Sequence, residues 1–240
     1  GCAGLSLSLS ADDEPLHRAL SRGFRRVTAS CEPDPHEPVE AGTAVDLWRD
    51  DDDTPRALQR FLSLARRAGR RVHLQHVRGA EELALLVGHR DIATSASAID
   101  DLASDEPSAE ALWQAIRGGL VEAIHTGSGA ASGGVHLLLP QLLEHVHAGR
   151  LGLMHLADLL SAGPARIYNV ARKGRLALGF DADFVLVDLA AEHTHLGART
   201  HGWPVATVLR GDVVAREGRV HAGPSGTPVR FSDTLRMVVL

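Results

Sequence analysis

Apolar positions in the chain switch repeatedly between the alternation typical of strands and the spacing of three and four typical of helices. Alternation predicts a first strand at Leu5–Leu9, and the next segment, Pro15–Gly23, predicts a helix that ends at a glycine. Later strands are predicted at "RRVTAS", "RRVHLQHV", "DIATSAS" and "VEAIHT". Later helices are predicted at "AEELALLV", "SAEALWQAI", "GVHLLLPQLLEHVHAG" and "LMHLADLLSAG". This order of strands and helices indicates βαβ units and a parallel sheet.

An acidic stretch interrupts the longest helical pattern, which runs from Thr43 to Ala68. Between Asp50 and Pro55, four aspartates and a proline predict a break and a new helix N-terminus. The same aspartates lack the alternating spacing and the distal glutamate of an EF-hand loop, so they predict a solvated turn rather than a calcium site. The acidic, proline-rich segment "CEPDPHEP" ahead of this pattern is predicted to be a loop.

The pattern changes after Ala171. The segments "GRLALGFDADFVLVDL" and "WPVATVLRGDVVAREGRV" are rich in valine, glycine and turn residues and show no helical period. They predict a small antiparallel β unit. We therefore expect two parts, residues 1–171 and residues 172–240.

Composition and charge narrow the function. Aromatic residues make up 4% of the 240 residues, so the core must be built from aliphatic side chains, which suits parallel strands covered by helices. The formal net charge is −5 and the arginines are scattered, which argues against a nucleic-acid partner. Cys2 and Cys31 are too few for a disulfide framework. No apolar run is long enough to span a bilayer, so we expect a cytoplasmic protein without a membrane partner.

Two features suggest chemistry on their residues alone. The small residues of "TGSGAASGG", Thr126–Gly134, follow a predicted strand, as in phosphate-binding loops, but they lack a GK[ST] sequence and the GxGxxG spacing, so a plain βα loop is favoured. Of the 14 histidines, His73 and His76 are three apart in a predicted strand and are expected to face opposite sides. Four others are interpreted as solvated positions of helices: His136, His145, His147 and His155.

The strongest signal is a resemblance. "LLSAGPARIYNVARKGRLALGFDADFVLVDL", Leu159–Leu189, closely resembles the end of the barrel and the return into the β-sandwich in amidohydrolases of the dihydroorotase, allantoinase and hydantoinase group. "GWPVATVLRGDVVAREGRV" is similar to the closing hairpin of that group. The resemblance implies an α/β fold, in which an incomplete (β/α)8 TIM-barrel-type amidohydrolase domain at 1–171 is followed by a small composite β-sandwich unit at 172–240.

Members of that group use zinc ions to activate a hydroxide against a cyclic amide, with an aspartate moving the proton. The resemblance places Ser6 where the bridging carboxylated lysine belongs and Ser30 where a ligand histidine belongs. In the similar His-x-x-His-Val-Ser strand, His76 matches a metal ligand, while Arg78 replaces the serine. The early HxH strand has no counterpart, so the chain is expected to be a fragment of a longer protein or to oligomerise.

The stretch "AIHTGSGA" is similar to the family's Ala-Thr-Asp-His-Ala-Pro. Thr126 is kept, Gly127 replaces the catalytic aspartate, and Ser128 replaces the histidine that follows it. The Asn-Pro-Pro-Leu-Arg segment that would contact substrate is lacking. The resemblance therefore implies one surviving metal ligand, His76, no catalytic residue, no bound cofactor and no identifiable substrate-binding residue.

Three functions follow as hypotheses. The first is a catalytically impaired dihydroorotase-like protein, kept as a structural or regulatory partner of aspartate carbamoyltransferase in pyrimidine biosynthesis. The second is an active zinc-dependent cyclic amidohydrolase with a relocated site, in which His76 and His125 bind the metal together with Glu32 or His73. The third is an anion-binding module that uses the Ser/Gly loop around Gly129.

Overall fold

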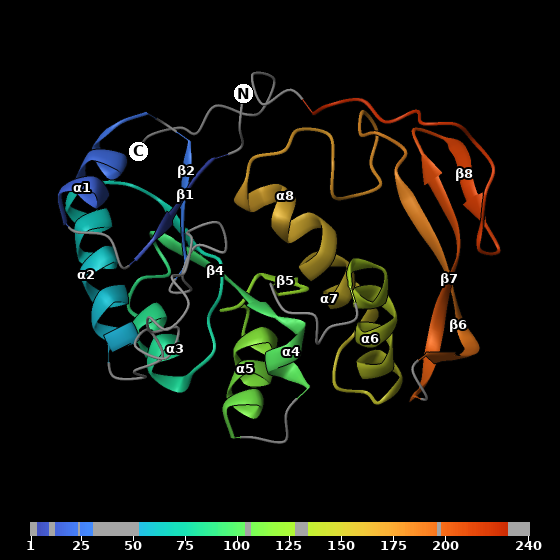
Figure 1. The fold of residues 1–240 in the computed structure, drawn as a ribbon, viewed down its shortest axis with the longest axis horizontal. Helices are drawn as coiled ribbons and strands as arrows, with labels where there is room; N and C mark the ends of the chain where they lie inside the picture. Colours follow the sequence, from blue (N-terminus) through green and yellow to red (C-terminus); the bar gives the residue numbers. More distant parts are fainter. Residues whose placement is uncertain are drawn as a thin grey trace, which may run out of the picture. The chain divides into compact units, whose positions relative to one another are not determined.

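The structure is a computed structural model that describes residues 4–9, 13–23, 25–30, 53–103, 107–127, 134–195 and 198–229. The chain divides into two compact units after residue 128. Each unit is built around one sheet (Figure 1).

The first unit contains a five-stranded parallel sheet in which the strands lie in chain order. Its strands are β1 (Gly4–Ser8), β2 (Arg26–Ser30), β3 (Val72–Leu74), β4 (Ala93–Ala98) and β5 (Ala123–His125). The register pairs Val27 with Val72 and Val72 with Ala93, so small apolar side chains meet along the centre of the sheet. These central strands are buried, as the aliphatic composition predicts.

Helices connect the strands of this unit: α1 (Asp13–Ser21), α2 (Asp53–Arg67), α3 (Ala80–Val87), α4 (Ile99–Leu102) and α5 (Pro107–Arg117). Helix α2 packs against α1 and α3, and α3 packs against α5 (Figure 1). Their buried side chains form much of the core, including Leu16, Phe61, Leu62, Leu112, Trp113 and Ile116.

The second unit begins with helices and ends with a four-stranded antiparallel sheet. The helical elements are α6 (Val135–His147), α7 (Leu153–Ala157), a π-helical turn η2 (Asp158–Ala162) and α8 (Gly163–Ile167). The strands, again in chain order, are β6 (Phe184–His195), β7 (Ala198–Leu209), β8 (Asp212–Arg216) and β9 (Arg219–Val220).

The single helix predicted at Leu153–Gly163 differs in the structure, where η2 separates α7 from α8. Pro164 has no backbone N–H and its ring crowds the preceding turn, so a regular α-helical hydrogen bond to the carbonyl of Leu160 cannot form there. A widened turn just before a proline is a common response.

Helix α6 packs against strand β7 within the second unit. Gly202 makes this close approach possible: its φ is +88°, and a Cβ atom there would lie 3.0 Å from the Cβ of Leu143. Beside this contact, the backbone N–H of His201 donates to Oε2 of Glu144 at 2.7 Å. Packing and hydrogen bonding thus fix the same pair of elements.

The described architecture confirms the predicted α/β class, with parallel strands and helices followed by an antiparallel β unit. The last helix ends at Ile167 and the first antiparallel strand begins at Phe184, so the change from helices to strands falls around Ala171. The compact second unit begins earlier in the chain and also includes α6, α7 and α8. The division into 1–171 and 172–240 stays a prediction. The predicted loop at 31–38 and the acidic turn up to Asp52 lie outside the described residues. Within the described ranges, no helix is long and apolar enough to cross a membrane.

Candidate functional site

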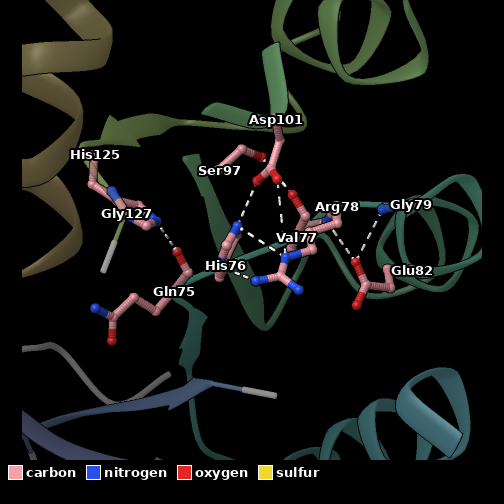
Figure 2. A network of polar contacts seen from close by, with 10 residues as sticks. All are labelled: Gln75, His76, Val77, Arg78, Gly79, Glu82, Ser97, Asp101, His125 and Gly127. Carbon is pink, nitrogen blue, oxygen red and sulfur yellow. Dashed lines mark hydrogen bonds and ion pairs between the residues drawn. The ribbon is translucent and has the colours of Figure 1, made fainter. Parts of the chain in front are cut away.

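Polar side chains gather where the last three parallel strands end. Strand β3 ends at Leu74, β4 at Ala98 and β5 at His125. Because the strands are parallel, their carboxyl ends lie along one edge of the sheet, the edge at which α/β folds place their sites. His76, Asp101 and His125 extend from these ends into one polar network (Figure 2).

His76 and Asp101 form the centre of the network. Nε2 of His76 lies 2.5 Å from Oδ2 of Asp101, and the side chains are 6% and 24% exposed. A carboxylate at this distance requires a proton between the two atoms, which we place on Nε2. With that proton the nitrogen has no lone pair left for a metal ion.

Arg78 lies against the same imidazole ring. Its Nε atom is 3.2 Å from Nε2 of His76, and its Nη2 atom is 3.4 Å from Nδ1. Nε2 cannot donate to Asp101 and accept from Arg78 at once, and the shorter contact identifies Asp101 as its partner. The guanidinium therefore acts on this pair mainly by charge, with Nε 4.0 Å from Oδ1 of Asp101.

Backbone contacts position Arg78. Buried Glu82, in the first turn of α3, accepts hydrogen bonds from the backbone N–H groups of Arg78 at 2.6 Å and of Gly79 at 3.1 Å. The hydroxyl of Ser97 donates to the carbonyl of Val77 at 2.8 Å and ties the same turn to β4. Carboxylate bonds to N–H groups at a helix start are charge-assisted, so this turn is well determined (Figure 2).

His125 has both ring nitrogens engaged by backbone. Its Nε2–H donates to the carbonyl of Gln75 at 2.8 Å, and its Nδ1 accepts from the N–H of Gly127 at 3.0 Å. These bonds fix one neutral tautomer. The ring stands edge-on to that of His76, with centroids 5.3 Å apart and planes at 84°.

His73 is buried inside the sheet layer and is 2% exposed. Its Nδ1 lies 2.9 Å from the hydroxyl oxygen of Thr94, which itself donates to the carbonyl of Val72. Burial, followed by the nearby charge of Arg26, lowers the pKa of His73 to about 3, so the ring is neutral. The predicted strand that contained both His73 and His76 is shorter in the structure, and His76 lies beyond its end.

The neighbouring carboxyl group shows how crowded this edge is with charge. Burial, followed by the repulsion from Asp101, raises the pKa of Asp100 above its ordinary value. The imidazoles of His76 and His125 act in the opposite direction. A positive group beside Asp101 therefore relieves an unfavourable concentration of negative charge.

The described residues do not fit the zinc site that the resemblance implies. Ser6 lies within β1 and Ser30 is the last residue of β2, and both offer only neutral hydroxyl groups. Gly127 offers no side chain. No three histidine, cysteine, aspartate or glutamate side chains gather to hold a metal among the residues described here. Cys31, Glu32, Ser128 and Gly129 lie outside them.

Sequence reasoning identified His76 and the unusual Arg78 but missed Asp101. The aspartate lies on α4, a helix of 4 residues, which is too short to show a hydrophobic period. The available signal was its position just after β4, because side chains that follow the carboxyl ends of parallel strands lie at the site edge of the sheet.

Comparison with known proteins gives the context of this site. Residues 61–214 match the model of the amidohydrolase family. The allantoinase of Rubrobacter xylanophilus is 30% identical in an alignment 228 residues long, and the match covers 72% of this chain and 50% of that protein. The dihydroorotase of Methanothermobacter thermautotrophicus is 36% identical over 103 residues, which cover 37% of this chain and 24% of that protein.

Among solved structures, a D-hydantoinase (dihydropyrimidinase) from Thermus sp. superposes with a TM-score of 0.78 at 18% identity, covering 93% of this chain and 66% of that one. This likeness confirms the predicted fold, an incomplete (β/α)8 TIM-barrel-type domain followed by a small β-sandwich unit. The chain spans about half the length of the allantoinase that it matches. Because the family model covers residues 61–214, the region with His76, Asp101 and both sheets' central strands, the chain belongs to the amidohydrolase family.

Proposed function

We propose that this chain is a catalytically impaired, dihydroorotase-like amidohydrolase that acts as a structural or regulatory partner of aspartate carbamoyltransferase. One observation carries the catalytic part: the single surviving ligand position, His76, has its Nε2 engaged by Asp101 at 2.5 Å, with Arg78 at 3.2 Å from the same atom.

Hydrolysis of a cyclic amide needs a strong nucleophile and a proton carrier. A zinc-bound hydroxide requires several anionic or imidazole ligands, and Ser6, Ser30 and Gly127 supply none. Glycine at the position of the catalytic aspartate also removes a general base, which typically contributes on the order of 10² to 10⁴ in rate. Both losses point to an impaired enzyme.

The partner is proposed by resemblance. Degenerate members of the dihydroorotase group serve as structural partners of aspartate carbamoyltransferase, and relatives of this chain include proteins named dihydroorotase. This part of the proposal is tested by mixing the purified chain with the aspartate carbamoyltransferase of the same organism. Co-elution in size-exclusion chromatography at micromolar concentration is expected, and separate elution would refute the partner.

The catalytic part is tested on the unaltered chain with added zinc, using dihydroorotate, hydantoin and allantoin as substrates. We expect no hydrolysis above a buffer control and no zinc retained after dialysis, as measured by elemental analysis. Turnover of any one substrate that disappears in His76→Ala would overturn the impairment.

A second candidate function is a zinc-dependent cyclic amidohydrolase with a relocated site. The neighbouring rings of His76 and His125, with centroids 5.3 Å apart, favour it, because imidazole nitrogens are common zinc ligands. Its weakness is that both nitrogens of His125 already bond to backbone groups. Hydrolysis that requires both histidines would establish this alternative.

A further inference from the structure

We propose that the guanidinium of Arg78 takes the place of a metal ion in this site, supplying the positive charge that holds Asp101 beside His76 and keeping divalent metal from Nε2 of His76. The inference rests on the proposed function and extends it from a loss of ligands to a replacement of the cation.

The burial of His76 and Asp101 calls for a positive group beside them. The imidazole of His76 is 6% exposed and the carboxylate of Asp101 is 24% exposed, whereas the side chain of Arg78 is 49% exposed. A carboxylate that is largely removed from water is unfavourable unless a positive group or strong donors compensate it. Arg78 compensates it while keeping part of its own guanidinium in water.

The guanidinium of Arg78 lies where it can supply that charge. The Nε atom of Arg78 lies 3.2 Å from Nε2 of His76 and 4.0 Å from Oδ1 of Asp101, on the side where both polar atoms meet. A metal ion bound to Nε2 would sit at about 2.1 Å from it. Such an ion would have to displace the proton shared with Asp101 and then face the guanidinium, whose charge repels it.

Hydrogen bonds fix the turn from which the side chain of Arg78 extends. Its backbone N–H donates to buried Glu82, and the turn that it starts is tied to β4 by Ser97. Glu82 is therefore a positioning residue for the backbone from which the guanidinium extends. In the family motif this position carries a serine, a residue too short to reach the imidazole.

A double-mutant cycle on the full chain tests the charge replacement. Arg78→Ser leaves the Asp101 carboxylate with the hydrogen bond from His76 but without the neighbouring guanidinium charge, and it is expected to lower the Tm by about 5 °C. Asp101→Asn in the same chain is expected to restore part of that loss, so the two changes are not additive. The matched control is the exposed pair Arg66 and Asp91, 2.9 Å apart, where the corresponding changes should add. Additive effects at Arg78 and Asp101 would overturn the proposal.

Metal exclusion is tested with zinc alone. Zinc in large excess is expected to raise the Tm of Arg78→Ser, because His76 and Asp101 then offer two ligands to an ion whose coordination water completes, and to leave the unaltered chain and Arg78→Ser/His76→Ala unchanged. No zinc-dependent shift in Arg78→Ser, or an equal shift in the unaltered chain, would overturn the inference.

If Arg78→Ser does not fold, Arg78→Lys serves in its place. Lysine keeps the charge as a point without the guanidinium plane, so the cycle with Asp101→Asn should still show coupling while zinc gives no shift. Loss of that coupling would also count against the proposal. The proposed function fails by a different result, hydrolysis of a cyclic amide by the unaltered chain, so the two failures are distinguishable.

Discussion

The imidazole ring of His201 in β7 stacks on the ring of His147 at the end of α6, with centroids 3.8 Å apart and planes inclined by 3°. Oε2 of Glu144 accepts two hydrogen bonds from His201, one from the backbone N–H at 2.7 Å and one from Nδ1 at 3.0 Å. His147 is exposed, as predicted for a solvated helix position, and the stack adds a contact on one face of its ring. It joins helix and strand in the second unit.

This joint predicts acid sensitivity. Burial alone would raise the pKa of Glu144, but the hydrogen bonds from His201 and the nearby imidazoles hold it below its ordinary value of 4.5. A lowered carboxyl pKa gives stability that is present above pH 4.5 and is lost as the pH falls through the folded value. Urea unfolding at several pH values should show this loss in the unaltered chain and a smaller loss in Glu144→Gln.

The control for that series is Glu110→Gln, because Glu110 is exposed and pairs with Arg117 on the surface of α5. Its pH profile should follow that of the unaltered chain. An equally reduced acid loss in both variants would show that the effect is one of net charge and not of the joint.

Gly202 predicts a packing defect. Gly202→Ala places a methyl group 3.0 Å from the Cβ of Leu143 and also forces alanine to a φ of +88°. Gly211→Ala has a similar φ of +92° but nothing within 4 Å, so it carries the backbone strain alone. We expect a loss of unfolding free energy of about 1 kcal/mol for Gly211→Ala and about 2–3 kcal/mol for Gly202→Ala. Equal losses in chemical denaturation would rule out the close contact.

His73 predicts a second pH dependence, in a higher range. Its pKa is about 3 in the folded chain, below its ordinary value of 6.5. Between these two pH values the unfolded chain binds a proton at His73 and the folded chain does not. The stability is complete above pH 6.5 and falls as the pH drops toward 3, by at most about 1.4 kcal/mol per pH unit. His73→Asn, which does not titrate, should flatten the profile between pH 6 and pH 4.5 in urea unfolding, whereas the exposed His17→Asn should not.

Lys173 predicts local opening ahead of β6. Its Nζ binds Asp181 at 2.9 Å and also Asp183, whose Oδ1 in turn accepts from the backbone N–H of Arg210 at 2.7 Å. Lys173→Gln removes the cation that bridges the two carboxylates and leaves Arg172, 3.8 Å from Asp181, as the remaining partner on that side. Amide hydrogen exchange should become faster at Arg210 in this variant, while amides in α2 keep their protection. Unchanged exchange at Arg210 would mean that the carboxylates are held by other contacts.

Much of the fold was predictable because its elements are local. Helix α3 occupies the predicted residues Ala80–Val87, and the strand at Ala93–Ala98 departs from its prediction by a few residues. Helix α4 and the π-helical turn were not predicted, since one is too short for a period and the other depends on the strain before Pro164.

The site was predictable only in part. His76 and Arg78 stand in a recognisable motif, but their partner Asp101 is 25 residues away from His76 along the chain. Only the register that pairs Val72 with Ala93 brings the two strand ends together, and no periodicity in the sequence encodes that register. The fixed tautomer of His125 likewise depends on Gln75, 50 residues away.

The order of strands in the parallel sheet has a consequence for how the chain acquires its structure. Each strand from β2 to β5 lies beside the strand just before it, so none has to insert between two that are already paired. A growing chain can therefore extend this sheet at one edge, adding a helix and a strand at a time as they leave the ribosome. Stepwise addition of this kind closes only the connections between consecutive strands, and the entropic cost of closing a loop rises slowly with its length.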